Sequence, residues 1–178
     1  MATMILLPDG SSSVADWTPA PFPNTIAGAL DDDNGDTSYV KSDTNNAAMT
    51  IEYANPSVAE ADIDTITSVR FLSSGRSTHR TYSSRVLIAF AVPSGNASEG
   101  VRYDPHASSH ETINGTARPY SDGLGGTNWT YSDLENLEMR CTKNGTQQLR
   151  LSYLAIRVTY TEAVAAVTDN ATFFGSNF

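Results

Sequence analysis

Alternation of apolar and polar residues predicts several short strands in the middle of the chain. Met49–Tyr53 and Ile63–Leu72 place apolar side chains at about every second position, the period of a strand with one buried face. Arg85–Val92 is almost continuously apolar, which predicts a central strand covered on both faces. Turn-forming residues at 73–76 and 93–96 separate these runs. The pattern therefore favours antiparallel sheet.

The same alternation returns near the end of the chain. Glu138–Thr142 and Gln148–Tyr160 are predicted strands, and the intervening Lys143–Thr146 contains Asn-Gly, a typical hairpin signal. One short helical turn is predicted just before them, over Ser132–Leu137. Ser132 would cap this turn, and Glu135, three residues later, would complete a capping box.

The first part of the chain is rich in helix-breaking residues. Prolines at positions 8, 19, 21 and 23 are incompatible with a helix or a central strand. We therefore expect residues 1–30 to form an extended segment that lies across a sheet, with Trp17 as its anchor. An acidic turn at 31–36 and a short strand at 37–41 should follow, and a weak strand is expected at Glu111–Ala117 within the polar region 94–128.

Eight or more strands at roughly ten-residue spacing predict a fold of the all-β class. We expect one antiparallel β-sandwich, with a jelly roll as the first choice, that contains a single short helical turn. Residues 1–160 should form this domain and 161–178 a C-terminal tail. The predicted core comprises Val69, Phe71, Val86, Ile88, Phe90, Leu134, Leu137, Ile156 and Val158.

Composition supports the all-β prediction. Ser, Thr and Asn make up 52 of the 178 residues, whereas there are only 2 Lys and 7 Glu, the residues that usually cover helix surfaces. Ser and Asn compete with the helix backbone, while Thr fits strands and Asn fits turns. A helical bundle, a coiled coil and a long-helix α/β enzyme are therefore disfavoured.

Charge and cysteine content exclude several classes of function. The net charge is −9, and the 11 Lys and Arg residues are spread thinly, so we expect no direct contact with nucleic acid. No segment is apolar for long enough to span a membrane, and no signal peptide is apparent. The single Cys141 excludes an internal disulfide and is expected to be a small buried hydrophobe. We predict no cofactor.

Candidate metal and catalytic motifs are incomplete. Asp32, Asn34 and Asp36 have calcium-loop spacing, but Thr37 and Asp43 occupy the places of the required Gly and Glu, so an acidic turn is favoured. His106 and His110 are four residues apart without the Glu of a zinc protease motif. No nucleophile elbow, phosphate loop or dinucleotide fingerprint is present, so we expect no catalytic and no metal site.

Four short motifs resemble those of tailed-bacteriophage virion structural proteins of the jelly-roll decoration, or cement, type. They are W-T-x-x-D-L-x-x-L-E at 129–138, a last strand ending x-V-x-Y at 154–160, D-x-x-Y-V at 36–40 and I-T-S-V-R at 66–70. This resemblance spans residues 30–160 and implies no catalytic residue. It implies a protein that is assembled in the host cytoplasm and resides in the virion.

The resemblance and the acidic surface favour one function and leave a second open. The favoured function is a decoration protein that binds the outside of a phage head, bridges copies of the major capsid protein and contacts copies of itself as a dimer or trimer. The alternative is a receptor-binding or carbohydrate-binding module of a phage tail or head fibre. Its stacking platform would then include Trp17, Trp129, Tyr131 and the 94–128 loops.

Candidate interface residues lie near the two ends of the chain. Phe173, Phe174 and Phe178 follow an apolar run at 163–167, and three exposed aromatic side chains would need a cover. The tail is therefore expected either to pack on its own domain or to act as an assembly arm, with Trp17 as a further possible interface residue.

Overall fold

The computed structural model confirms an all-β fold with a single short α-helix. It describes residues 1–21, 25–32, 37–77, 85–91 and 128–164, together with the backbone of three short strands between 101 and 119. The strands are β1 (Ala2–Leu6), β2 (Pro8–Ala15), β3 (Thr18–Ala20), β4 (Tyr39–Ser42), β5 (Ala48–Tyr53), β6 (Ile63–Ser77), β7 (Arg85–Ala91), β8 (Val101–Tyr103), β9 (Glu111–Asn114), β10 (Arg118–Pro119), β11 (Glu138–Asn144) and β12 (Leu149–Glu162). The helix α1 is Tyr131–Glu135, and single 3-10 turns occur at Ala27–Ala29 and Glu60–Asp62.

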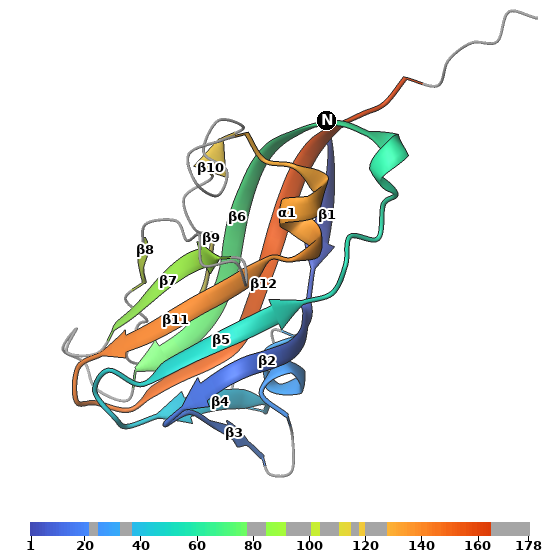
Figure 1. Cartoon of the computed structure of the whole chain (residues 1–178). Helices are drawn as coiled ribbons and strands as arrows, with labels where there is room; N and C mark the ends of the chain where they lie inside the picture. Colours follow the sequence, from blue (N-terminus) through green and yellow to red (C-terminus); the bar gives the residue numbers. More distant parts are fainter. Residues whose placement is uncertain are drawn as a thin grey trace, which may run out of the picture.

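The strands form two antiparallel sheets that pack as a sandwich. Sheet A has the order β10-β6-β12-β4-β3, with β1 also paired to β12 and β9 to β6; sheet B has the order β2-β5-β11-β7-β8. Figure 1 shows β6, β12 and β1 in one layer and β11, β5 and β2 in the other. Most consecutive strands lie in opposite sheets, which is the connectivity of a jelly roll. No helix within the described residues has the length and apolarity to cross a membrane.

The longest pairing joins β6 to β12 and organises sheet A. It runs from Leu149 opposite Ser77 to Glu162 opposite Ile63, so the last strand continues two residues beyond the expected end of the domain at Tyr160. The other side of β12 pairs with β4 at one end and with β1 at the other. Between them, the Leu154 N–H donates to the Leu30 carbonyl (3.0 Å).

The nine predicted core residues are all buried. The interpretation of the continuous apolar run at Arg85–Val92 was wrong. β7 is not covered on both faces, because Val86, Ile88 and Phe90 are buried while Leu87 and Ala89 are half-buried. The continuous apolar run therefore belongs to an ordinary strand whose outward positions happen to hold a Leu and an Ala.

The predicted hairpin at Asn144-Gly145 is also not a hairpin, because the strands on its two sides lie in different sheets. Lys143 lies beneath the connection, is 0% exposed and forms hydrogen bonds with it. Its Nζ donates to the carbonyls of Thr44 (3.1 Å) and Gly145, and the Gly145 N–H donates to Asn45 Oδ1 (2.7 Å). Gly145 has φ of 105°, the left-handed region that favours glycine. This turn therefore bonds to the β4–β5 turn instead of closing a two-stranded ribbon.

The short helix α1 begins one residue earlier than predicted and has a different cap. Thr130 is the N-cap, and its side chain accepts from the Asp133 N–H (3.2 Å), while the Asp133 carboxylate accepts from the Thr130 N–H (2.8 Å). Asp133 thus occupies the capping-box place that we assigned to Glu135, and Thr130 that of Ser132. The buried Leu134 then faces the core from the helix.

The N-terminal segment contributes strands that the sequence did not predict. β1 and β3 lie at free edges of sheet A and β2 at an edge of sheet B, where proline is tolerated. Trp17 is 3% exposed and is an anchor in the core, as expected. Its Nε1 has no hydrogen-bond partner among the described residues, and the same is true of Trp129 Nε1.

Gly75 is needed for the close approach of β12 to β6. A Cβ at this position would lie 2.6 Å from the Arg150 carbonyl oxygen and 2.7 Å from Leu151 Cδ2. We expect Gly75→Ala to lower the free energy of unfolding by about 1–3 kcal/mol, because the crowded atoms are mostly part of the paired strand. Urea denaturation followed by tryptophan fluorescence measures this. Gly28→Ala is the matched control, because Gly28 is exposed and its Cβ would meet only the Thr25 side chain. Equal losses in the two variants would contradict the close-approach argument.

Burial of Cys141 should make the free energy of unfolding depend on pH in the alkaline range. Its side chain is 1% exposed, and burial raises the pKa of the thiol from 9.0 to about 12. Between these two values the folded chain holds a proton that the unfolded chain releases, so the free energy of unfolding should fall as pH rises from 9.0 towards about 12. Denaturation curves at several pH values test this, with Cys141→Ala expected to show a shallower fall. An unchanged slope in that variant would contradict the assignment.

Candidate functional site

Three cationic side chains stand in one row across three adjacent strands of sheet A. Arg150 on β12 is in register with Arg76 on β6 and, on its other side, with Lys41 on β4. We call these three residues the basic row. They are 35 and 74 positions apart in the sequence, so only the strand pairing brings them together.

The basic row lies on the outer face of the sandwich. Val40, Leu149 and Leu151 are fully buried, and they alternate with Lys41 and Arg150 along β4 and β12. Because successive side chains of a strand point to opposite faces, the basic side chains point away from the core. All three are half-buried, with their stems against the sheet.

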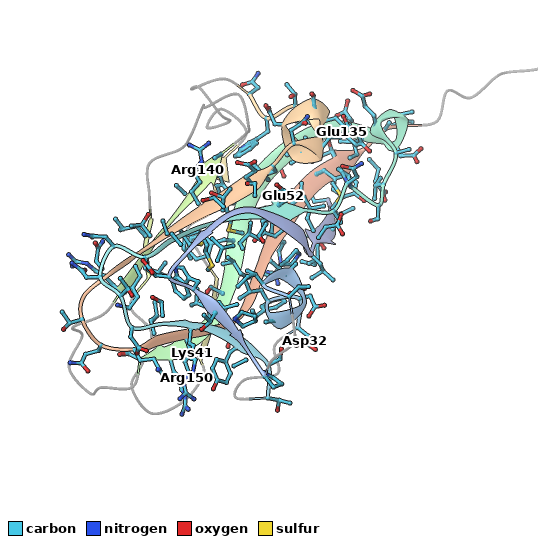
Figure 2. The ribbon with its side chains drawn as sticks, turned by 60° about the horizontal axis from the view of Figure 1, so that its bottom comes forward. Asp32, Lys41, Glu52, Glu135, Arg140 and Arg150 are labelled. Carbon is cyan, nitrogen blue, oxygen red and sulfur yellow. The ribbon has the colours of Figure 1, made fainter. Side chains whose placement is uncertain are left out.

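Arg150 is held in place by an aromatic ring and a polar chain. Its guanidinium carbon lies 4.7 Å from the centre of the Tyr39 ring, and its Nε donates to Gln148 Oε1 (2.9 Å). Gln148 in turn donates to Asp43 Oδ1 (3.0 Å). Figure 2 shows Arg150 and Lys41 together, well away from Glu52, Glu135 and Arg140. The central cation of the row is therefore preorganised.

Charges of both signs lie beside the basic row, since Asp43 accepts from Gln148 and Lys143 lies nearby. Lys143 lies beneath the neighbouring turn; burial lowers the pKa of its ammonium, and Asp43 opposes this effect. Like charges directly opposite one another on paired strands are destabilising. The contact of Arg150 with Tyr39 is a favourable cation–π interaction that offsets part of this repulsion.

The side chains of the basic row are suited to binding a ligand that carries oxygen atoms. Guanidinium and ammonium groups donate hydrogen bonds to oxygen atoms, and an adjacent tyrosine offers a flat apolar surface. Among the described residues, no group of three or more His, Cys, Asp and Glu side chains is arranged to hold a metal ion.

A second polar site, which we call the acidic pocket, lies on sheet B next to α1. It has a volume of about 230 Å³, and four of its lining residues are Asp9, Glu52, Glu135 and Glu138. Glu52 and Glu138 are directly opposite on β5 and β11. Glu138 also lies 3.9 Å from Arg140, measured from Oε2 to Nη2. The pocket is a concentration of negative charge on the opposite sheet from the basic row.

Of the aromatic platform expected from the sequence, the described part is not exposed at either tryptophan. Trp17 and Trp129 are each 3% exposed, so neither presents a ring face or an interface to solvent. Trp129 packs edge-on against Phe90, with ring centres 6.0 Å apart. Tyr131 is half-buried, and its hydroxyl donates to the Val58 carbonyl (3.0 Å). Both tryptophans therefore pack in the core, whereas a stacking platform for a ligand would need them at the surface.

Several other predicted sites lie outside the described residues. They are the possible interface residues Phe173, Phe174 and Phe178, the histidines His106 and His110, most of the acidic turn 31–36 and the side chains of the 94–128 loops.

Sequence reasoning missed the basic row. Lys41 and Arg150 occupy polar positions in alternating strands, but the sequence pattern predicts a strand end at Leu72 and a turn that contains Arg76, whereas β6 continues to Ser77. The basic residues that are spread thinly along the chain are therefore locally concentrated in space.

Comparison with known proteins gives only distant structural similarity. No protein-family model matches the sequence, and no curated protein matches it significantly. The C-terminal CBM6 of LamC, a marine laminarinase from Zobellia galactanivorans, is 9% identical with a TM-score of 0.46, over 89% of this chain and 99% of that one. The xylan-binding module CBM15 is 10% identical with a TM-score of 0.46, over 91% and 100%. The N-terminal cellulose-binding domain of Cellulomonas fimi β-1,4-glucanase C is 10% identical with a TM-score of 0.36, over 84% and 90%. The sandwich architecture is established by the strand pairing above, independently of these similarities.

Proposed function

We propose that this chain is a non-catalytic module that binds carbohydrate through the basic row on the outer face of sheet A. The observation that supports the proposal is Arg150, fixed by Tyr39 and Gln148 between two further cations in register. A guanidinium group donates two parallel hydrogen bonds, a geometry that suits paired oxygen atoms of a sugar. The half-buried Tyr39 ring adds an apolar surface for the C–H face of a sugar.

The position of the row suits a polymer. A ligand that lies across β4, β12 and β6 meets Lys41, Arg150 and Arg76 in succession on an extended sheet face. Small molecules, in contrast, are usually enclosed in concave pockets. We therefore expect a carbohydrate chain that is held at several points along its length.

The proposal predicts that Arg150→Ala weakens binding to carbohydrate polymers. Removal of a charged hydrogen-bond donor costs about 1.5–3 kcal/mol, which corresponds to a loss of about tenfold or more in affinity. A panel of soluble polysaccharides assayed by affinity electrophoresis and isothermal titration calorimetry measures the effect. Tyr39→Ala should give a smaller loss, because Arg150 then loses one of its two supports.

Arg140→Ala is the matched control. Arg140 lies on β11, in the opposite sheet, and its side chain is 42% exposed beside Glu138, so its removal changes the net charge equally. Binding should be unchanged in this variant. Equal losses for Arg140→Ala and Arg150→Ala would contradict a site at the basic row.

A capsid decoration protein is the second candidate. It is favoured by the exposed apolar side chains of the N-terminal strands, where Ile5, Leu7 and Val14 are 40–41% exposed. Such side chains are suited to contact with a neighbouring subunit. Quantitative protein composition of purified virions tests this candidate: hundreds of copies in each particle support decoration, and absence from the particle contradicts it.

A further inference from the structure

We infer that the carbohydrate bound by the basic row is an acidic polysaccharide, whose sugars carry carboxylate or sulfate groups. The inference rests on the proposed function and adds the chemical class of the ligand. It follows from the charge, spacing and fork geometry of Lys41, Arg150 and Arg76 on sheet A.

The first argument concerns charge. The chain has a net charge of −9 and only 11 Lys and Arg residues, yet three of these are neighbours in one row. Both pairs of neighbours place like charges directly opposite each other, an arrangement that lowers stability. An anionic sugar is attracted to these three cations, an attraction that a neutral sugar lacks. The row is therefore complementary to negative charge.

The second argument concerns spacing. Paired strands are about 4.8 Å apart, so the Lys41 and Arg76 backbones are about 10 Å apart, with Arg150 midway. The three cations therefore follow a line across the sheet, and a polymer that lies along this line meets each of them in turn. The geometry therefore favours a chain with repeated anionic groups over an isolated phosphate or carboxylate.

The third argument concerns the type of cation. Arg150 and Arg76 carry planar guanidinium groups, which pair with carboxylate and sulfate oxygens through two parallel bonds. Lysine carries the same charge without this fork. The contact of Arg150 with the Tyr39 ring and the hydrogen bond from its Nε to Gln148 restrict the guanidinium before the ligand arrives. Arg150→Lys should therefore weaken binding although it keeps the charge.

The experiment compares polymers that share a backbone and differ in charge. Polygalacturonate is set against its methyl ester for carboxylate, and dextran sulfate against dextran for sulfate, with titration calorimetry on the full chain. We expect the charged member of at least one pair to bind about tenfold or more tightly than its neutral partner. Raising the salt from about 50 mM to about 300 mM should weaken the charged complex by about tenfold, because the row is exposed to screening.

Variants test whether the basic row causes the preference for the charged polymer. Arg150→Ala and Arg150→Lys should both lose about tenfold in affinity for the charged polymer, because Lys restores the charge without the fork. Arg140→Ala, on sheet B, should bind as the unaltered chain does. Circular dichroism and thermal unfolding of each variant confirm that the fold is retained.

The outcomes separate this inference from the proposed function. If the neutral polymer binds as well as the charged one and Arg150→Ala abolishes both, the ligand class is wrong and carbohydrate binding stands. If no polymer binds, both are overturned. Binding to double-stranded DNA with equal affinity and salt dependence would overturn the inference too, because the row would then be a general site for polyanions.

Discussion

The antiparallel pairing of β6 with β12 is the constraint on which the rest of this molecule depends. It supplies the inner wall of the core through Val69, Phe71 and Ile156, and β12 carries β4 and β1 on its free side. A register shift between Leu151 and Tyr153 follows directly after the row that contains Arg150. Gly75, opposite Leu151, allows the backbones to approach there. The same pairing therefore builds the core on one face and aligns the cations on the other.

Alignment of like charges has to be balanced by local interactions. Arg150 contacts the Tyr39 ring, and Gln148 connects its Nε to Asp43. Each of these contacts contributes a small stabilising energy. The three cations are also half-exposed, and water reduces the repulsion between them. The common effect of these contacts is on geometry: the central cation is held in one orientation. A site of this kind loses little side-chain entropy when a ligand binds, which raises affinity without additional contacts.

The sequence predicted the composition of the core better than the arrangement of the strands. Period-2 patterns identified Val69, Phe71 and Val158 as buried, because burial in a strand depends on the alternation of that strand alone. Sheet membership depends on contacts between distant segments. Asn144-Gly145 has the chemistry of a hairpin but crosses between sheets, since buried Lys143 bonds to a turn that is 99 residues away in the sequence. The basic row was inaccessible for the same reason, because it is defined by register across three strands and by no local motif.

The burial of both tryptophans decides where a ligand can be recognised on the described surface. A stacking site at Trp17 or Trp129 would require the core to open, since each is 3% exposed. The half-buried Tyr39 is the aromatic ring that lies beside a cation at the sheet surface. In the proposed function, recognition depends mainly on charged hydrogen bonds, with the ring as support for Arg150. Such a surface distinguishes ligands by the pattern of their oxygen atoms and charges more than by the flatness of their rings, and this is the physical reason to expect selectivity for charge.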